Sequence, residues 1–281
     1  METSLLRKKL EEYGYFCGEE LALILNLSET LAKPILLEGP AGVGKTELAK
    51  AYAAVTGREL IRLQCYEGLD ERHALYEWNY QKQLLYLESQ KQASWQETKK
   101  DLFSEEFLLA RPLLRAFLSE KPAVLLIDEI DKSDEEFESF LLEALSDFSV
   151  TVPEFGTVTA KSVPMIFLTS NAMRDFSDGL KRRCVHFYID YPSAEREAAV
   201  LRRKIPGIGE DLTAEIAAFA GKVRKKKLDR MPGLAEVMEW AKVLCELGIE
   251  DLNDPAIAPT YHFLVKSRHD YDLLCEEKNA K

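Results

Sequence analysis

The sequence lacks the features of membrane-spanning and secreted proteins. No apolar run reaches the about 18 residues that a helix needs to cross a bilayer. The segment Met1–Leu10 is polar and contains no apolar signal-peptide core. We therefore expect a cytoplasmic protein without a membrane partner.

Cysteine is scarce and poorly spaced for structural chemistry. The chain has five cysteines, an odd number, and no two of them have CxxC spacing: Cys17, Cys65, Cys184, Cys245 and Cys275. This argues against a zinc site and against a disulfide framework. They are predicted to be small apolar side chains in a reducing compartment.

The chain also has no excess of positive charge, because its formal net charge is −11. An acidic surface repels the phosphate backbone, so nucleic acid is disfavoured as a partner. The basic stretch Lys222–Arg230 departs from this trend. It is either a solvated helix face or end, or a positive edge that faces a nucleotide or a neighbouring subunit.

The chain contains no low-complexity tract and no internal repeat, and its 281 residues suffice for one large domain or two ordinary ones. Short apolar runs alternate with helical or loop sequence, which is typical of a parallel sheet covered on both faces. The predicted strands are Pro34–Glu38, Leu60–Gln64, Ala123–Ile127, Met165–Thr169 and Val185–Ile189, and a helix is predicted for Thr46–Thr56. The fold class is therefore α/β.

Two segments interrupt this alternation. Residues 66–118, rich in aromatic side chains, are predicted to form inserted helices, and residues 148–160 a β-hairpin. After Tyr191–Pro192 the pattern becomes helical, with no further strand. We expect a nucleotide-binding domain at 1–191 and a small all-helical domain at 192–281, with helices at Ser193–Lys204, Leu212–Lys227, Leu234–Leu247 and Pro255–Val265.

The strongest motif is a glycine-rich loop that follows the first strand and precedes a helix. The segment Gly39–Thr46 fits G-x-x-x-x-G-K-[ST] at every required position. Its glycines let backbone N–H groups point inward at phosphates, and the helix N-terminus adds partial positive charge. Lys45 is predicted to reach the β- and γ-phosphates of ATP, and the Thr46 hydroxyl to join Mg²⁺. The predicted nucleotide-binding residues are Gly39, Pro40, Ala41, Gly42, Val43, Gly44, Lys45, Thr46 and Glu47.

A second constellation stands at the ends of two other strands. Ala123–Ile127 is followed directly by Asp128 and Glu129. Since ligands bind at the carboxyl edge of open α/β sheets, Asp128 is predicted to hold Mg²⁺ through water and Glu129 to polarise the attacking water. Asn171, which ends the strand at Met165–Ser170, is a third candidate: it either forms a turn or orients that water.

In this order the motifs resemble the AAA+ ATPases, and within them the MoxR branch and its CoxD-like members. The resemblance covers nearly the whole chain. It is carried by Gly39–Thr46, Leu125–Asp131, the hairpin, Thr169–Asn171 and Leu180–Cys184; Cys65–Asp70, Tyr76–Trp78, Arg111–Arg115 and His186–Tyr191 are more particular to the CoxD-like group.

The resemblance implies a P-loop NTPase αβα core with a helical lid, assembled into a ring, commonly a hexamer. It implies that Arg183 reaches the γ-phosphate of a neighbouring subunit, with Arg182 in reserve, whereas the alternative for both is surface charge ahead of a strand. It also suggests an adenine pocket at Tyr15, Phe16 and Gly18. The chain departs from the branch at Met231–Gly233, where many members have Ser-Pro-Arg. Either Arg230 or Lys227 replaces the arginine, or its phosphate contact is absent.

The function implied by the resemblance is an ATP-driven, chaperone-like motor. The CoxD-like members point to a metalloenzyme client, such as a molybdenum hydroxylase awaiting maturation, and the family often has a separate von Willebrand A domain partner. The inserted helices and the hairpin are the expected client contacts. Two alternatives stay open: a nucleotide-gated binding module with little turnover, and a DNA-processing AAA+ motor, which the acidic charge disfavours.

Overall fold

The computed structural model describes residues 1–89 and 101–279 and divides the chain into two compact units. One unit comprises Leu23–Glu38 and Tyr52–Phe187, and the other comprises Met1–Ala22, Gly39–Ala51 and Tyr188–Lys281. The predicted boundary near Tyr191–Pro192 stays a prediction. Within the described residues, no helix is long and apolar enough to cross a membrane.

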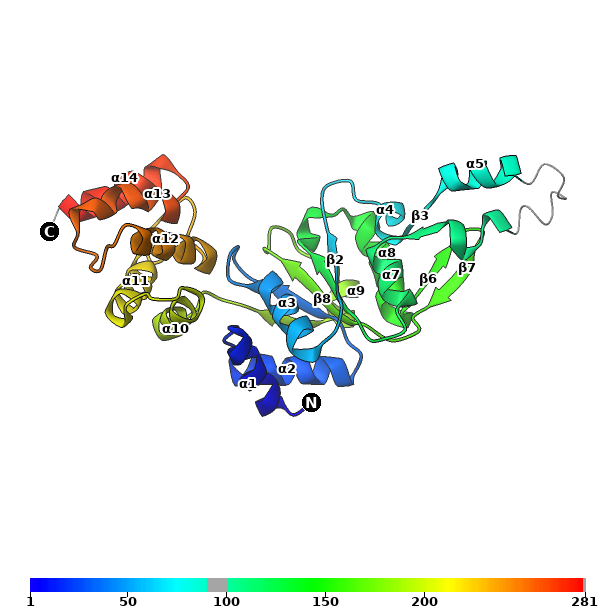
Figure 1. Cartoon of the computed structure of the whole chain (residues 1–281), viewed down its shortest axis with the longest axis horizontal. Coiled ribbons are helices and arrows are strands. Elements are labelled where there is room, and N and C mark those ends of the chain that lie inside the picture. The colour runs from blue at the N-terminus through cyan, green and yellow to red at the C-terminus, as the bar shows by residue number, and fades with distance from the viewer. Residues whose placement is uncertain (90–100, 280–281) are drawn as a thin grey trace. The chain divides into compact units, whose positions relative to one another are not determined.

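The first unit is built on a five-stranded sheet with the order β2-β5-β8-β1-β9 (Figure 1). Its strands are β1 (Ile35–Glu38), β2 (Leu60–Gln64), β5 (Val124–Asp128), β8 (Met165–Ser170) and β9 (Val185–Tyr188). The pairs β1–β8, β2–β5 and β5–β8 are parallel. All five predicted strands and the α/β fold class are confirmed.

The burial of the strands explains why the sequence pattern predicted this sheet correctly. Every residue of β5 and β8 is buried, as expected for central parallel strands covered on both faces. Helix α7 (Pro112–Leu118) packs against β2 and β5 on one face. On the other, Tyr52 of α3 (Lys45–Thr56) meets Phe167 of β8 edge to face, with ring centroids 5.5 Å apart.

The register of the parallel pairs brings functional side chains to one edge. Gln64 lies opposite Asp128, and Ile127 lies opposite Leu168. The carboxyl ends of β2, β5 and β8 therefore place Gln64, Asp128 and Thr169 beside one another. This edge is where open α/β sheets bind ligands.

The insertion contains the predicted helices together with two short strands that were not predicted. The described part contains α4 (Glu71–Leu75) and α5 (Tyr80–Ser89), but also an antiparallel pair of short strands, β3 (Tyr76–Trp78) and β4 (Leu108–Ala110). Trp78 packs edge to face on Tyr76 and Phe103, with centroids 6.0 and 5.2 Å apart. These aromatic residues favour strands where a partner is available. Residues 90–100 of the predicted insertion lie outside the described residues.

The predicted hairpin is confirmed as β6 (Ser149–Val152) paired with β7 (Gly156–Thr159). The helices around it begin with side-chain caps, as expected for Asp and Ser at these positions. Asp134 caps α8 (Glu135–Asp147) by accepting from the Phe137 N–H, and Ser177 caps α9 (Asp178–Arg183) by accepting from the Leu180 N–H.

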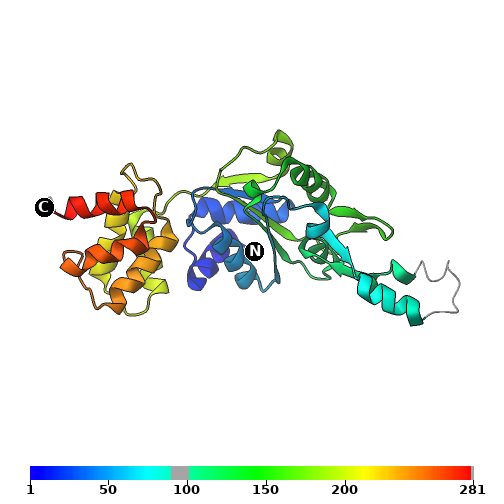
Figure 2. The ribbon, with the colours of Figure 1, turned by 90° about the horizontal axis from the view of Figure 1, so that it is seen from above.

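The second unit is helical apart from the phosphate loop. Besides α1 (Thr3–Tyr13) it contains α10 (Ala194–Lys204), α11 (Glu210–Val223), α12 (Leu234–Glu246), α13 (Tyr261–Leu264) and α14 (Arg268–Asn279), which are yellow to red in Figure 2. Trp240 is fully buried among them, and its ring N–H donates to Thr260 Oγ1 at 2.8 Å.

The predicted helices of this unit are present with shifted ends. Helix α11 stops at Val223, so the prediction of a helix to Lys227 was too long. The segment Pro255–Val265 is a 3₁₀ helix, Pro255–Thr260, followed by α13, because Pro259 cannot donate to a regular α-helical ladder. Helices α1, α14 and α2 (Glu19–Thr30) were not predicted.

Candidate functional site

The glycine loop has the backbone that the motif requires. Gly39, Gly42 and Gly44 have φ values of 149°, 77° and 100°, a region that L side chains rarely adopt. A Cβ on Gly39 would also lie 2.0 Å from the Ile189 carbonyl oxygen. Both the conformation and the close approach therefore select glycine.

Lys45 lies inside this curled loop. Its side chain is buried, and Nζ donates to the carbonyl oxygens of Gly39 and Pro40, each at 2.7 Å. Helix α3 begins at Lys45, so the partial positive charge of its N-terminus lies at the end of the loop. The cradle thus combines an ammonium group, a helix N-terminus and glycine backbone, which together suit polyphosphate.

Glu47 follows the loop but is engaged with cations. Its carboxylate lies 3.3 Å from Lys204 Nζ of α10 and 3.8 Å from Lys50 Nζ. Tyr15, expected near the adenine, is buried against the loop, since a Cβ on Gly44 would lie 3.6 Å from its ring. Burial raises the pKa of the Tyr15 hydroxyl, so it stays neutral.

The first turn of α12 approaches the loop too closely for a side chain. A Cβ on Gly233 would lie 2.6 Å from the Ala41 oxygen and 2.9 Å from the Gly42 Cα. The Ala235 N–H donates to the Gly42 oxygen at 3.3 Å, and the Gly233 N–H donates to Glu236 Oε2 at 3.0 Å. The departure from Ser-Pro-Arg therefore coincides with direct backbone packing on the phosphate loop.

A buried ion pair contacts Pro232, the residue before Gly233. The Arg224 guanidinium donates to both oxygens of Glu197, at 2.9 and 2.7 Å, and to the Pro232 oxygen at 2.8 Å. It also lies over the Tyr191 ring. Burial outweighs this partner and raises the pKa of Glu197. Arg224 of the basic stretch is thus structural, and the Arg230 N–H donates to Asp270 at 3.2 Å.

The acid pair lies at the carboxyl end of β5 in the other unit. The Asp128 side chain is 2% exposed, and its Oδ1 accepts from Thr169 Oγ1 at 2.5 Å. Its Oδ2 accepts from Nε and Nη2 of Arg62, at 3.0 and 2.6 Å. Asp128 is therefore a buried carboxylate whose charge is balanced by the neighbouring strand.

Glu129 is held in a strained backbone conformation. Its φ and ψ are 58° and 49°, which costs a residue with a side chain about 1–2 kcal/mol. Its N–H donates to Thr169 Oγ1 at 2.9 Å. Its carboxylate accepts from Gln64 Nε2 at 2.8 Å and from Lys132 Nζ at 2.6 Å. The strain is offset by these contacts and directs the carboxylate toward the edge of the sheet.

The carboxylates of the acid pair and of Asp131 lie near the buried thiol of Cys65. Burial raises the pKa of the nearby Cys65 thiol to about 12, and the carboxylates of Asp128, Asp131 and Glu129 add to this effect. The Asn171 N–H donates to Asp131 Oδ2 at 3.0 Å, which fixes the turn after β8. Strands β5 and β8 are adjacent, so Asn171 follows a strand that neighbours the one ending at Asp128, and its role stays a prediction.

The donor chemistry fits magnesium held together with a nucleotide. Among the described residues, no group of three or more His, Cys, Asp or Glu side chains could hold a metal ion by itself. Magnesium is characteristically held by one or two protein oxygens together with substrate phosphates. The Asp128 carboxylate and the Thr46 hydroxyl are such hard oxygen ligands.

Arg183 ends α9 with its side chain exposed. Its Nε donates to Ser146 Oγ and its Nη1 to the Gly179 oxygen at 3.3 Å. The adjacent Arg182 is also exposed. Both arginine side chains are therefore accessible from the surface.

Sequence reasoning missed the residues that hold the acid pair: Arg62, Gln64, Lys132 and Thr169. A signal existed on β2, where Arg62 and Gln64 are the polar positions of an otherwise apolar strand and recur with period two. Their partners depend on register, which a single sequence does not reveal.

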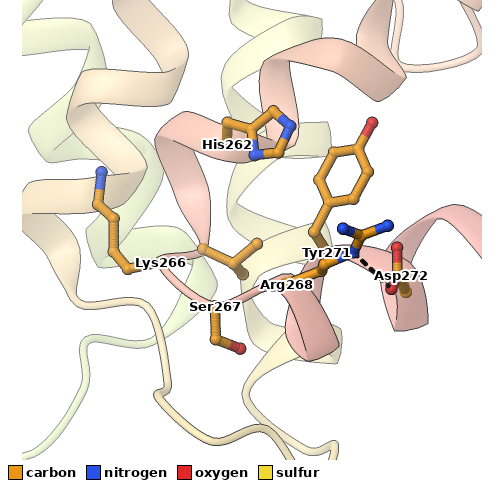
Figure 3. Close-up of a pocket in the computed structure, with 7 residues that line it drawn as sticks. His262, Lys266, Ser267, Arg268, Tyr271 and Asp272 are labelled. Carbon is orange, nitrogen blue, oxygen red and sulfur yellow. Dashed lines mark ion pairs between the residues drawn. The ribbon is translucent and has the colours of Figure 1, made fainter.

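A separate cavity of about 600 Å³ lies on the helical unit (Figure 3). The rings of His262 and Tyr271 stack there, with centroids 4.1 Å apart, beside the Arg268–Asp272 ion pair. None of the predicted site residues lines it. This cavity is therefore distinct from the phosphate loop.

A glycine loop between a strand and a helix, with an acidic pair ending another parallel strand, is characteristic of P-loop nucleoside triphosphatases. Residues 34–184, just over half of the chain, match the family described as AAA domain (dynein-related subfamily). The chain belongs to this family. It therefore has a nucleotide-binding fold whose members generally hydrolyse ATP and typically form oligomeric rings.

Individual relatives agree with this assignment. Protein NorQ of Paracoccus denitrificans (strain Pd 1222) is 24% identical over 218 residues, which cover 75% of this chain and 71% of NorQ. A proline-to-glycine mutant of Thermotoga maritima RuvB has a TM-score of 0.52 at 18% identity, covering 91% of this chain and 72% of that one. An alanine-to-serine RuvB mutant gives 0.50 at 18% identity, covering 92% and 73%. The RuvB likeness establishes the fold alone.

Proposed function

We propose that this chain binds ATP with magnesium and hydrolyses it. The observation that carries the proposal is the curled glycine loop around the buried Lys45, in a chain whose β5 strand delivers Asp128 and Glu129 to the edge of a parallel sheet. The AAA family membership supports the same reaction.

Each residue has a defined role in this proposal. The loop N–H groups and Lys45 bind the phosphates, and Thr46 and Asp128 hold magnesium, which neutralises phosphate charge when bound. Glu129 accepts a proton from the attacking water, and Asn171 orients that water. Arg183, or Arg182 in its place, stabilises the transition-state charge on a neighbouring subunit's nucleotide.

We further propose that the chain is a MoxR-type member that works as a ring, commonly a hexamer, and remodels a client protein. The sequence similarity to NorQ supports this placement. A metalloenzyme such as a molybdenum hydroxylase is the proposed client class, and a von Willebrand A domain protein the proposed helper. The insertion and the β6–β7 hairpin are the proposed client contacts, and 1–191 and 192–281 the proposed domains.

A specific observation favours a second function, a nucleotide-gated binding module with little turnover. Gly233 replaces the arginine that many MoxR members carry, and backbone packing on Ala41 and Gly42 leaves no room for a side chain. Without that arginine, ATP occupancy alone could serve as the signal.

Phosphate release separates the two functions. Wild type, Glu129→Gln and the control Glu135→Gln, which changes an exposed glutamate of α8, are compared at saturating ATP and magnesium. Hydrolysis predicts that Glu129→Gln is slower by about 10²-fold or more while Glu135→Gln retains activity. A wild-type rate no faster than that of Glu129→Gln would favour the binding module. A low-salt gel shift that depends on Lys225–Lys227 would instead favour a DNA-processing motor.

A further inference from the structure

Arg62 occupies one oxygen of the carboxylate proposed to hold magnesium. It lies on β2, and its Nε and Nη2 both donate to Asp128 Oδ2, at 3.0 and 2.6 Å. Thr169 donates to the other oxygen, Oδ1, at 2.5 Å. Both oxygens of a nearly fully buried carboxylate are therefore engaged by protein donors.

A guanidinium nitrogen that contacts Asp128 also contacts Gln64. Arg62 Nη2 donates to Gln64 Oε1, and Gln64 Nε2 donates to Glu129 Oε2 at 2.8 Å. Arg62 and Gln64 share one face of β2 because they are two residues apart. A continuous chain of contacts thus runs from Asp128 through Arg62 and Gln64 to Glu129.

These contacts have an electrostatic consequence. A buried carboxylate requires a compensating charge, and Arg62 supplies it without metal. The same positive charge opposes a divalent cation at Asp128. The Arg62 side chain is 48% exposed, so solvent is available to it if the ion pair opens.

We infer that Arg62 is a positioning residue that sets the magnesium affinity of the Asp128 carboxylate. Its positive charge balances that of Asp128 in the metal-free protein, and its hydrogen bonds to Oδ2 break when the cation is bound. This inference rests on the proposed ATP and magnesium site and adds a determinant of its metal dependence. Because Arg62 also holds Gln64, its release loosens one of the restraints on Glu129.

The test compares nucleotide affinity with and without metal. A fluorescent non-hydrolysable ATP analogue is titrated into wild type, Arg62→Gln, Arg62→Lys and Arg115→Gln, in saturating magnesium and in EDTA. Arg115 is the matched control, because it is an exposed arginine of the same unit that pairs with Glu59. The quantity compared is the affinity in magnesium divided by the affinity in EDTA for each protein. A loss of correctly folded protein lowers both affinities equally and leaves this ratio unchanged.

Arg62→Gln is expected to raise this ratio about tenfold, since it removes a like charge beside the cation site. Arg62→Lys, which keeps the charge, should remain nearer to wild type, and Arg115→Gln should match it. An Arg62→Gln ratio equal to the wild-type ratio, in protein that binds the analogue, overturns the inference alone. Wild type that binds no analogue in either condition overturns the proposed function as well. If Arg62→Gln does not fold, Arg62→Met, which also removes the charge, takes its place, and an Arg62→Met ratio equal to the wild-type ratio overturns the inference.

Discussion

Gly233→Ala is expected to destabilise the protein although it adds a single methyl group. The methyl carbon would lie 2.6 Å from the Ala41 oxygen and 2.9 Å from the Gly42 Cα, where ordinary contact begins at 3.4 Å. Both neighbours are backbone atoms of the phosphate loop, so neither can rotate away. The start of α12 must therefore retreat by 3.4 − 2.6, or about 0.8 Å.

The expected cost follows from three effects. Overpacking against a rigid neighbour costs about 1–3 kcal/mol. The Ala235 N–H bond to the Gly42 oxygen, already 3.3 Å long, is lost at about 1 kcal/mol. Alanine in place of glycine at the position before a helix costs about 0.5–1 kcal/mol. With partial relaxation we expect about 2 kcal/mol, or a Tm lower by roughly 4–8 °C.

Thermal unfolding of Gly233→Ala and Gly209→Ala measures this cost directly. Gly209 precedes α11 in the same way, and a Cβ there would meet nothing within 4 Å. The control therefore carries the capping change without the clash. A difference of 1 °C in Tm corresponds to about 0.3 kcal/mol of unfolding free energy. If Gly233→Ala melts within about 1 °C of Gly209→Ala, the close packing of α12 on the loop is refuted.

Two further predictions concern the sheet unit. Arg183→Ala should bind ATP normally but hydrolyse it at least about 10³-fold more slowly, because the neighbouring subunit's nucleotide loses its guanidinium contact. Arg182→Ala should stay near wild type. The opposite ranking in phosphate-release assays would assign the role to Arg182. Glu138 has a lowered pKa, since hydrogen bonds from Ser177 and Arg174 together outweigh its burial, which is the largest effect and raises it. Its stabilisation is therefore complete above the unfolded-state pKa of about 4.3 and lost as pH falls. Glu138→Gln should lower Tm near neutral pH by an amount that shrinks toward about pH 3, and a pH-independent difference between the two melting curves would refute this.

Local sequence pattern was sufficient for the central strands and the phosphate loop. Leu60–Gln64 was predicted with the bounds that β2 has, and β1, β5, β8 and β9 were placed within one residue at each end. Buried parallel strands are short apolar runs with clear borders, and the loop motif is contiguous. Both signals are local, so a single sequence contains them.

Features that depend on distant partners were missed. Strand β3 exists because Tyr76–Trp78 pairs with Leu108–Ala110, thirty or more residues away, and local periodicity does not encode that partner. The Arg62–Asp128 ion pair depends on the register of β2 against β5. The motif comparison identified Gly233 as a missing arginine, but only the backbone contact with Ala41 and Gly42 explains why glycine fits there.

The central claim is that the glycine loop and Lys45 bind the phosphates of ATP. Calorimetric titration of ATP and magnesium into wild type, Lys45→Ala and Lys50→Ala tests it most directly, since Lys50 lies on the same helix and pairs at 3.8 Å with Glu47. We predict saturable binding to wild type and Lys50→Ala, and affinity lower by about 10²-fold or more for Lys45→Ala. Equal ATP affinity in Lys45→Ala and wild type would contradict the assignment.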